Sequence, residues 1–195
     1  TTDSYVVHPI FFPGGDIGRL AVSGTVNDLA MMGATEPLAL TCAVILEDGF
    51  PRADLERIVL SVRDTAREAG APIVTGDTQG MGKGEVGGIA LNTTGIALAA
   101  RGVSDAGLRA GDRLIVTGTV GDHGMAIMSR RRDLGLEGDH RSDVAPLNGL
   151  VREALRAGGE DVVAMKDPTR GGLAGVLHEM AAKGKVGVVI DEQAV

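Results

Sequence analysis

The sequence predicts a mixed architecture of two parts, an N-terminal α+β domain over residues 1–104 and a partial C-terminal α/β domain over residues 105–195. Apolar runs of strand length alternate with longer segments whose apolar residues recur at helical spacing. A polar, turn-rich stretch at 104–112 is typical of a domain boundary. With 44% hydrophobic residues among 195, the chain can bury one good core or two small ones.

The N-terminal part is expected to place two helices between strands. Asp16 is typical of a helix N-cap, and Gly33 of a helix end. Pro51 and Gly70 bracket a second segment whose apolar residues keep helical spacing. The predicted helices are 16–32 and 52–69, the strands are 5–8, 37–46, 72–77 and 89–100, and the connections include a loop at 9–15 and a Gly-rich hairpin or flexible loop at 79–88.

The C-terminal part is expected to continue this alternation. A Gly-rich turn at 118–124 leads into a helix. The other predicted elements are strands at 113–116, 162–165 and 186–190 and helices at 142–157 and 168–183. The chain starts without Met inside a motif and stops just after an apolar run, so we expect a core piece that lacks both ends.

The stretch 73–78 organises the N-terminal part, because its apolar strand ends in a turn that delivers Asp77 to the strand exit. Asp3 precedes the first predicted strand, and Asp28 shares a helix face with small and apolar residues. Carboxylates alone repel a triphosphate, so an acidic nucleotide site requires Mg²⁺ between the two. We therefore hypothesise that the three acids converge on a magnesium nucleotide. The alternative is that each one caps a turn or a helix.

A second candidate site is the helix start at 167–172, where exposed amides, glycines and Arg170 are suited to an anion. The alternative is an ordinary helix start, with Asp167 as N-cap and a proline in the first helical position. The turn at 121–124 lacks the Lys and the spacing of a P-loop. Its His123 is the one histidine placed to contact a ligand.

Composition excludes several classes of function. The net charge of −7 and the pI near 5.1 disfavour nucleic acid as a partner, and one Tyr, three Phe and no Trp leave few platforms for base stacking. The apolar stretches fall short of a membrane span, so we expect no membrane partner. The single Cys42 rules out an internal disulfide, and with no signal peptide in view it predicts a cytoplasmic protein.

Six blocks together resemble the HypE family of hydrogenase maturation proteins, within the aminoimidazole ribonucleotide synthetase (PurM-like) superfamily. Their order and spacing match over essentially the whole chain. The blocks are residues 2–7 (TDSYVV), 11–18 (FFPGGDIG), 24–30 (GTVNDLA), 75–78 (TGDT), 118–124 (GTVGDHG) and 167–172 (DPTRGG).

The resemblance implies a PurM-like N-terminal α+β domain that dimerises through its sheet, a C-terminal α/β domain, and a cleft that binds ATP with Mg²⁺. It also implies an ATP-dependent carbamoyl dehydratase, which converts the thiocarboxamide on a C-terminal Cys into a thiocyanate. That group becomes the cyanide ligand of the iron in [NiFe]-hydrogenase. The implied partners are a second copy of the chain, the carbamoyltransferase HypF and the HypC–HypD complex.

By the same resemblance, Asp3, Asp28, Asp77 and Asp167 hold magnesium and phosphates. Asn27, Gly76, Thr78 and Arg170 complete the implied nucleotide site. No catalytic residue can be assigned, because the family's terminal Cys is absent from this chain. The Gly-rich segment that the family carries upstream of the first block is also absent, and Gln79 stands where the family often has Lys.

Other functions share the acidic ATP cleft. Selenophosphate synthetase and thiamine-monophosphate kinase are enzyme alternatives, although the FFPGG and DPTRGG blocks favour HypE. A further alternative is a binding module that holds nucleotide without turning it over.

Overall fold

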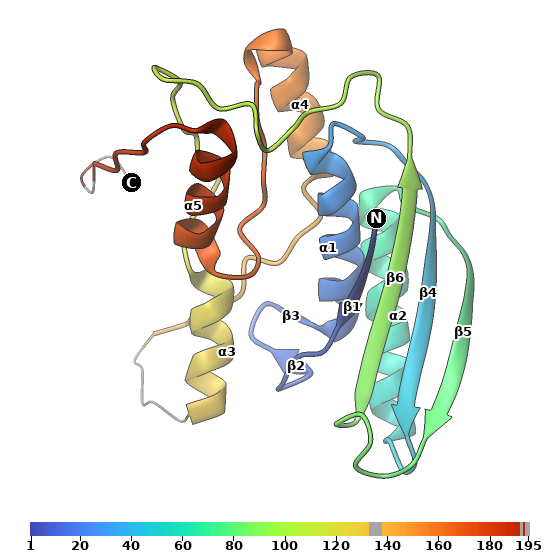
Figure 1. The fold of residues 1–195 in the computed structure, drawn as a ribbon. Coiled ribbons are helices and arrows are strands. Elements are labelled where there is room, and N and C mark those ends of the chain that lie inside the picture. Colours follow the sequence, from blue (N-terminus) through green and yellow to red (C-terminus); the bar gives the residue numbers. More distant parts are fainter. Residues whose placement is uncertain (133–137, 192, 194–195) are drawn as a thin grey trace.

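The computed structural model describes residues 1–132, 138–191 and 193 (Figure 1). The N-terminal part is a four-stranded sheet with two helices on one face. Its elements are β1 (Thr2–Tyr5), β2 (Phe11–Phe12), β3 (Gly15–Asp16), α1 (Ile17–Met31), β4 (Pro37–Glu47), α2 (Arg52–Ala69), β5 (Ile73–Met81) and β6 (Ile89–Ala97). The C-terminal elements are α3 (Asp122–Arg132), α4 (Asn148–Gly158), a 3₁₀ turn η1 (Gly159–Asp161) and α5 (Gly172–Gly184).

The strand order of the sheet is β1-β6-β4-β5, so β1 and β5 form its two edges. β6 pairs antiparallel with both β1 and β4, whereas β5 runs parallel to β4. Helix α2 connects these parallel strands, as a parallel pair requires a crossover. β2 and β3 form a separate short hairpin.

The core lies between the sheet and the two helices. Leu40 of β4 and Leu91 of β6 point toward the helices and are buried with Ile17 of α1 and Ile58 of α2. Side chains alternate across a strand, so Ile96, which lies next to the helix-facing Gly95, lies on the other face and is exposed. Within the described residues no helix is both long and apolar enough to cross a membrane.

The predicted helix caps are confirmed. The Asp16 side chain accepts hydrogen bonds from the backbone N–H of Gly18 at 2.7 Å and of Arg19 at 3.0 Å, which satisfies two donors at the start of α1. Gly70 ends α2 in the left-handed conformation with φ of 63°, and α2 has the bounds that the sequence predicts.

The N-terminal strands differ from their predicted ranges. β4 extends one residue further, to Glu47, and β6 ends at Ala97, not at residue 100. β1 ends at Tyr5, because its pairing with β6 ends there, and Val6 is exposed. β5 continues along β4 to Met81, so the Gly-rich connection is shorter than predicted. This connection is held by Glu47, whose carboxylate accepts hydrogen bonds from Val86 N and Gly87 N. These backbone donors lower the pKa of Glu47 to about 2.

The prediction of strands at 113–116, 162–165 and 186–190 is wrong. Within the described part of the chain these segments pair with no strand. Ile115 is 87% exposed and Val189 is 95% exposed. An apolar run predicts a strand only if another strand supplies its backbone hydrogen bonds.

Two C-terminal helices start later than predicted. The segment 142–147 remains outside α4 because its backbone bonds to the N-terminal part: Ser142 N donates to Pro13 O at 2.8 Å, and Val144 O accepts from Arg19 Nε at 2.9 Å. α5 starts at Gly172, not 168, because Gly171 has φ of 81°, which ends any helical run before it.

Helix α1 packs closely on β1, and this generates a prediction at Gly24. A Cβ added there would lie 2.4 Å from the Tyr5 hydroxyl oxygen and 2.9 Å from the Tyr5 ring. We expect Gly24→Ala to lower the free energy of unfolding by about 1–3 kcal/mol through overpacking, measured by denaturant unfolding. Gly149→Ala in α4 is the matched control, because a Cβ there meets no atom within 4 Å. Equal stability of the two variants would contradict the tight packing.

Candidate functional site

A chain of buried hydroxyls fixes β1 and α1 relative to each other. The Tyr5 hydroxyl lies 3.2 Å from Thr25 Oγ1, which also bonds to Thr93 Oγ1 of β6. Thr93 Oγ1 in turn donates to Ala21 O at 3.1 Å. Because these polar groups are buried, each needs its partner, and the chain sets the height of α1 along the sheet.

This arrangement brings Asp3 of β1 and Asp28 of α1 into one region. Asp3 lies two residues before Tyr5, and Asp28 lies three residues after Thr25, on the same helix face. Burial raises the pKa of Tyr5 above its usual range, and the charges of Asp3 and Asp28 raise it further. Thr1 Oγ1 donates to Asp28 Oδ2 at 2.8 Å, so the start of β1 is tied directly to the α1 carboxylate.

Asp167 approaches the same region from the C-terminal part. Burial raises the pKa of Asp167, and the charge of Asp28 is the next largest cause. Lys166 opposes the shift only weakly. The effect of the Asp28 charge on Asp167 indicates that the two carboxylates lie in the same region, and their role as magnesium ligands stays a prediction. Carboxylate oxygens are the ligands that Mg²⁺ prefers.

Asp77 does not join these acids within one chain. Asp77 lies on the edge strand β5, where it pairs with Ala43 of β4. Asp3 lies on the opposite edge strand β1, where it pairs with Thr93 of β6. Three strand spacings separate the edges, about 14 Å. Asp77 also faces away from the helices, since its row contains Asn92 and not Thr93. Among the described residues no three His, Cys, Asp or Glu side chains gather at metal-binding distance.

Gly76 and Thr78, which flank Asp77, lie on the same edge strand. A Cβ added to Gly76 would lie 2.0 Å from the carbonyl oxygen of Cys42 in the neighbouring strand. This close approach of two backbones is sufficient to require glycine there.

Asn27 has a different partner from the one the sequence suggested. Its Nδ2 donates to Ala145 O at 3.1 Å and its Oδ1 accepts from Leu147 N at 2.7 Å. Both ends of the amide are therefore used to hold the segment before α4 against α1. Arg170 is exposed in the turn before α5.

His123 is part of the packing between the two parts. Its Nδ1 lies 2.8 Å from Ser142 Oγ, and its ring meets Phe12 edge to face, with centroids 5.3 Å apart. Burial lowers the pKa of His123, and Asp143 partly offsets this. These contacts account for the histidine without a ligand.

The sequence did not single out Arg19 and Asn148, which also join the two parts. Arg19 binds both oxygens of Glu68 in addition to Val144 O. Asn148 Nδ2 donates to Thr35 O at 3.1 Å and to Ala69 O at 2.9 Å, near the ends of α1 and α2. An Arg and an Asn on helices carry no local signal of such distant partners.

A cavity of about 660 Å³ lies away from the acids, between α2 and the strands β4 and β5. Its lining is mostly apolar and includes Cys42, and burial raises the pKa of that thiol. No carboxylate is among the described residues that line it, so it offers no ligand to magnesium.

Comparison with known proteins gives the same assignment as the motifs. Residues 1–99 match the N-terminal domain of AIR synthase related proteins, and residues 109–195 match the C-terminal domain. The predicted boundary at 104/105 falls in the stretch between the two matches and stays a prediction.

The chain is 51% identical to the carbamoyl dehydratase HypE of Rhizobium leguminosarum bv. viciae, over 100% of this chain and 56% of that protein. It is also similar to the HypE–HypF complex structure, with a TM-score of 0.91, 50% identity and coverage of 95% of this chain and 61% of the other. For a structure of HypE in complex with ATP, the TM-score is 0.90 at 47% identity, with coverage of 94% and 55%.

A thiamine monophosphate kinase from Aquifex aeolicus is 18% identical with a TM-score of 0.62, which shows a shared fold alone. The chain spans little more than half the length of the HypE proteins it matches. The resemblance to HypE and the PurM-like fold, both expected from the motifs, are confirmed. The chain belongs to the family of AIR synthase related proteins.

Proposed function

We propose that this chain forms the ATP-binding part of a HypE-type carbamoyl dehydratase that acts in hydrogenase maturation. The observation that carries the proposal is the similarity to a HypE structure in complex with ATP, at 47% identity over 94% of this chain. The charge of Asp28 also contributes to the raised pKa of Asp167, which supports a common site for the two acids.

The donor set fits magnesium and a nucleotide. Carboxylate oxygens are hard ligands, which Mg²⁺ prefers. A magnesium ion between the carboxylates and a triphosphate offsets the repulsion between these negative groups. We propose Asp28 and Asp167 as ligands of the metal and Asp3 as a further residue of the nucleotide site. Thr1, which bonds to Asp28, orients that carboxylate.

Bound ATP supplies the phosphoryl group that turns the amide oxygen of a thiocarboxamide into a leaving group, so that a nitrile results. The residues of this chain bind and orient the phosphates, and the packing of residues 142–147 on α1 helps to exclude water from the site. Cys42 is not suited to carry the substrate, because it lies within β4 and burial raises the pKa of its thiol.

We also propose that the protein is a homodimer joined through the N-terminal sheet. β1 and β5 are the edge strands of the sheet that the described residues form, and each carries an acid of the predicted site. A pairing of β5 of one copy with β1 of the other would place the strand that carries Asp77 beside the strand that carries Asp3. HypF, named in the complex that this chain resembles, and HypC–HypD are the proposed partners, and the cytoplasm is the proposed location of the protein.

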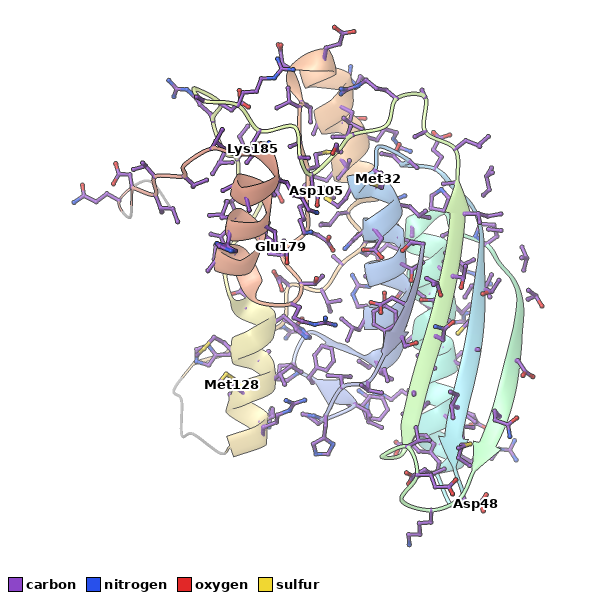
Figure 2. The ribbon with its side chains drawn as sticks, viewed as in Figure 1. Met32, Asp48, Asp105, Met128, Glu179 and Lys185 are labelled. Carbon is purple, nitrogen blue, oxygen red and sulfur yellow. The ribbon has the colours of Figure 1, made fainter. Side chains whose placement is uncertain are left out.

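The first test is a calorimetric titration of ATP with Mg²⁺ and with chelator. We expect binding only with Mg²⁺, and a loss of at least about 100-fold in affinity for Asp28→Asn, because the metal loses a charged ligand. Asp48→Asn is the matched control, since Asp48 is exposed and lies at the opposite end of the sheet from Met32, the residue that caps α1 (Figure 2). Unchanged affinity in Asp28→Asn would contradict the site. Binding without phosphate release in the full-length protein would favour the binding module instead.

The raised pKa of Asp167 predicts a dependence of stability on pH. The folded state binds this proton more tightly than the unfolded state, so the contribution to stability is present below the unfolded pKa of about 4 and is lost as pH rises through the folded value. Without Mg²⁺, we expect Asp167→Asn to raise Tm at pH 7, with a gain that shrinks as pH falls to about 4. Asp161→Asn, in the exposed turn η1, should leave Tm unchanged. A lower Tm for Asp167→Asn at pH 7 would contradict the like-charge pair.

The dimer is tested by mixing two inactive variants, Asp28→Asn and Asp77→Asn, after unfolding and refolding together. If the site uses Asp28 of one copy and Asp77 of the other, mixed dimers contain one intact site, and magnesium-dependent ATP binding returns at a fraction of the sites. If both acids act within one copy, no binding returns. Light scattering at micromolar concentration gives the oligomeric state, and a monomer there would count against the proposal.

A further inference from the structure

We propose that Lys166 is a positioning residue for Asp167, because its ion pairs with Asp105 and Glu179 hold the metal-binding carboxylate against α1. The inference rests on the proposed function above, in which Asp167 binds magnesium. It assigns a role to a charge cluster outside the site itself.

Lys166 joins three separate parts of the chain. Its Nζ lies 3.3 Å from Asp105 Oδ2, in the linker after β6, and 2.8 Å from Glu179 Oε2, on α5. The side chains of Lys166 and Asp105 are only 27% and 28% exposed, so water screens this pair less than an ordinary surface pair. Asp105 also bonds to Lys183 of α5. Figure 2 shows Asp105 and Glu179 close together beside α5.

The linker that carries Asp105 is itself fixed to the segment before Asp167. Arg101 donates to Gly159 O at 2.9 Å and to Val162 O at 3.1 Å. A Cβ added to Gly107 would lie 1.9 Å from Val163 O, so the two backbones touch there. The ion pair of Asp105 with Lys166 is the last of these ties before Asp167.

The same linker is connected to the helix that carries Asp28. Val103 is buried, and its N–H donates to Met32 O at the end of α1, at 3.2 Å. Asp28 and Asp167 are therefore connected through α1, the linker after β6 and the ion pair of Asp105 with Lys166.

The position of Lys166 explains why such a tie is needed. Residues 168–170, which follow Asp167, are exposed, so the restraint on Asp167 comes from the segment before it. The Lys166 ammonium forms ion pairs with Asp105 and Glu179, and these pairs restrain the backbone at Asp167. The Asp167 carboxylate does not take part in them, so it can bind a divalent ion. Asp28 and Asp167 are then held in position before Mg²⁺ binds, which reduces the conformational entropy lost on binding.

The test is a calorimetric titration of the full-length protein with ATP at stepped Mg²⁺ concentrations. We expect Lys166→Met to raise the Mg²⁺ concentration for half-maximal ATP binding about tenfold, as losses around metal ligands commonly do, while saturating Mg²⁺ restores full binding. Lys166→Arg should recover most of the loss because it keeps both ion pairs. Asp105→Asn breaks the tie from the other side and should act in the same direction.

Lys183→Met is the matched control, since it also removes a partner of Asp105 but does not touch the segment before Asp167. An unchanged Mg²⁺ requirement in Lys166→Met would overturn the inference, as would an equal rise in Lys183→Met, because the effect would then come from the linker as a whole. If the unmodified protein shows no magnesium-dependent binding, the proposed function itself fails, and the inference fails with it. Far-UV circular dichroism confirms that each variant is folded.

Discussion

The packing of α1 against β6 and β1 is the constraint on which the rest of the structure depends. Thr25 of α1 bonds to Tyr5 and Thr93 inside the core, where an unpaired hydroxyl is costly. Gly24 and Gly95 allow the close approach, because a Cβ at either position would fall within 3 Å of its neighbours. These contacts therefore fix the position and the rotation of α1 on the sheet, and with them the position of Asp28.

The C-terminal part is positioned by reference to the same helix. The side chains of Asn27 and Arg19 of α1 hold the backbone of segment 144–147 by hydrogen bonds, and Met32 O accepts from the linker after β6. These contacts set the path that brings Asp167 toward Asp28. Burial at this place raises the pKa of Asp167, and the charge of Asp28 raises it further.

The sheet order explains why one predicted acid is absent from this group. β5 follows β4 through the crossover helix α2 and takes the outer position, while β6 returns on the other side of β4 and pairs with β1. Asp77 is consequently placed at an edge with unpaired backbone groups, where a second strand can add. A site that needs both Asp3 and Asp77 is incomplete in one copy for this topological reason.

The sequence by itself determined the local features and the family. Asp16 and Gly70 mark helix ends because caps act within a few residues, and the periodicity of 52–69 predicts α2 without reference to any partner. The tertiary structure alone decided which acids meet, that Asn27 serves packing, and that 113–116 and 186–190 do not pair as strands in the described chain. Strand pairing and the meeting of side chains depend on contacts between residues far apart in sequence, and no local pattern encodes them.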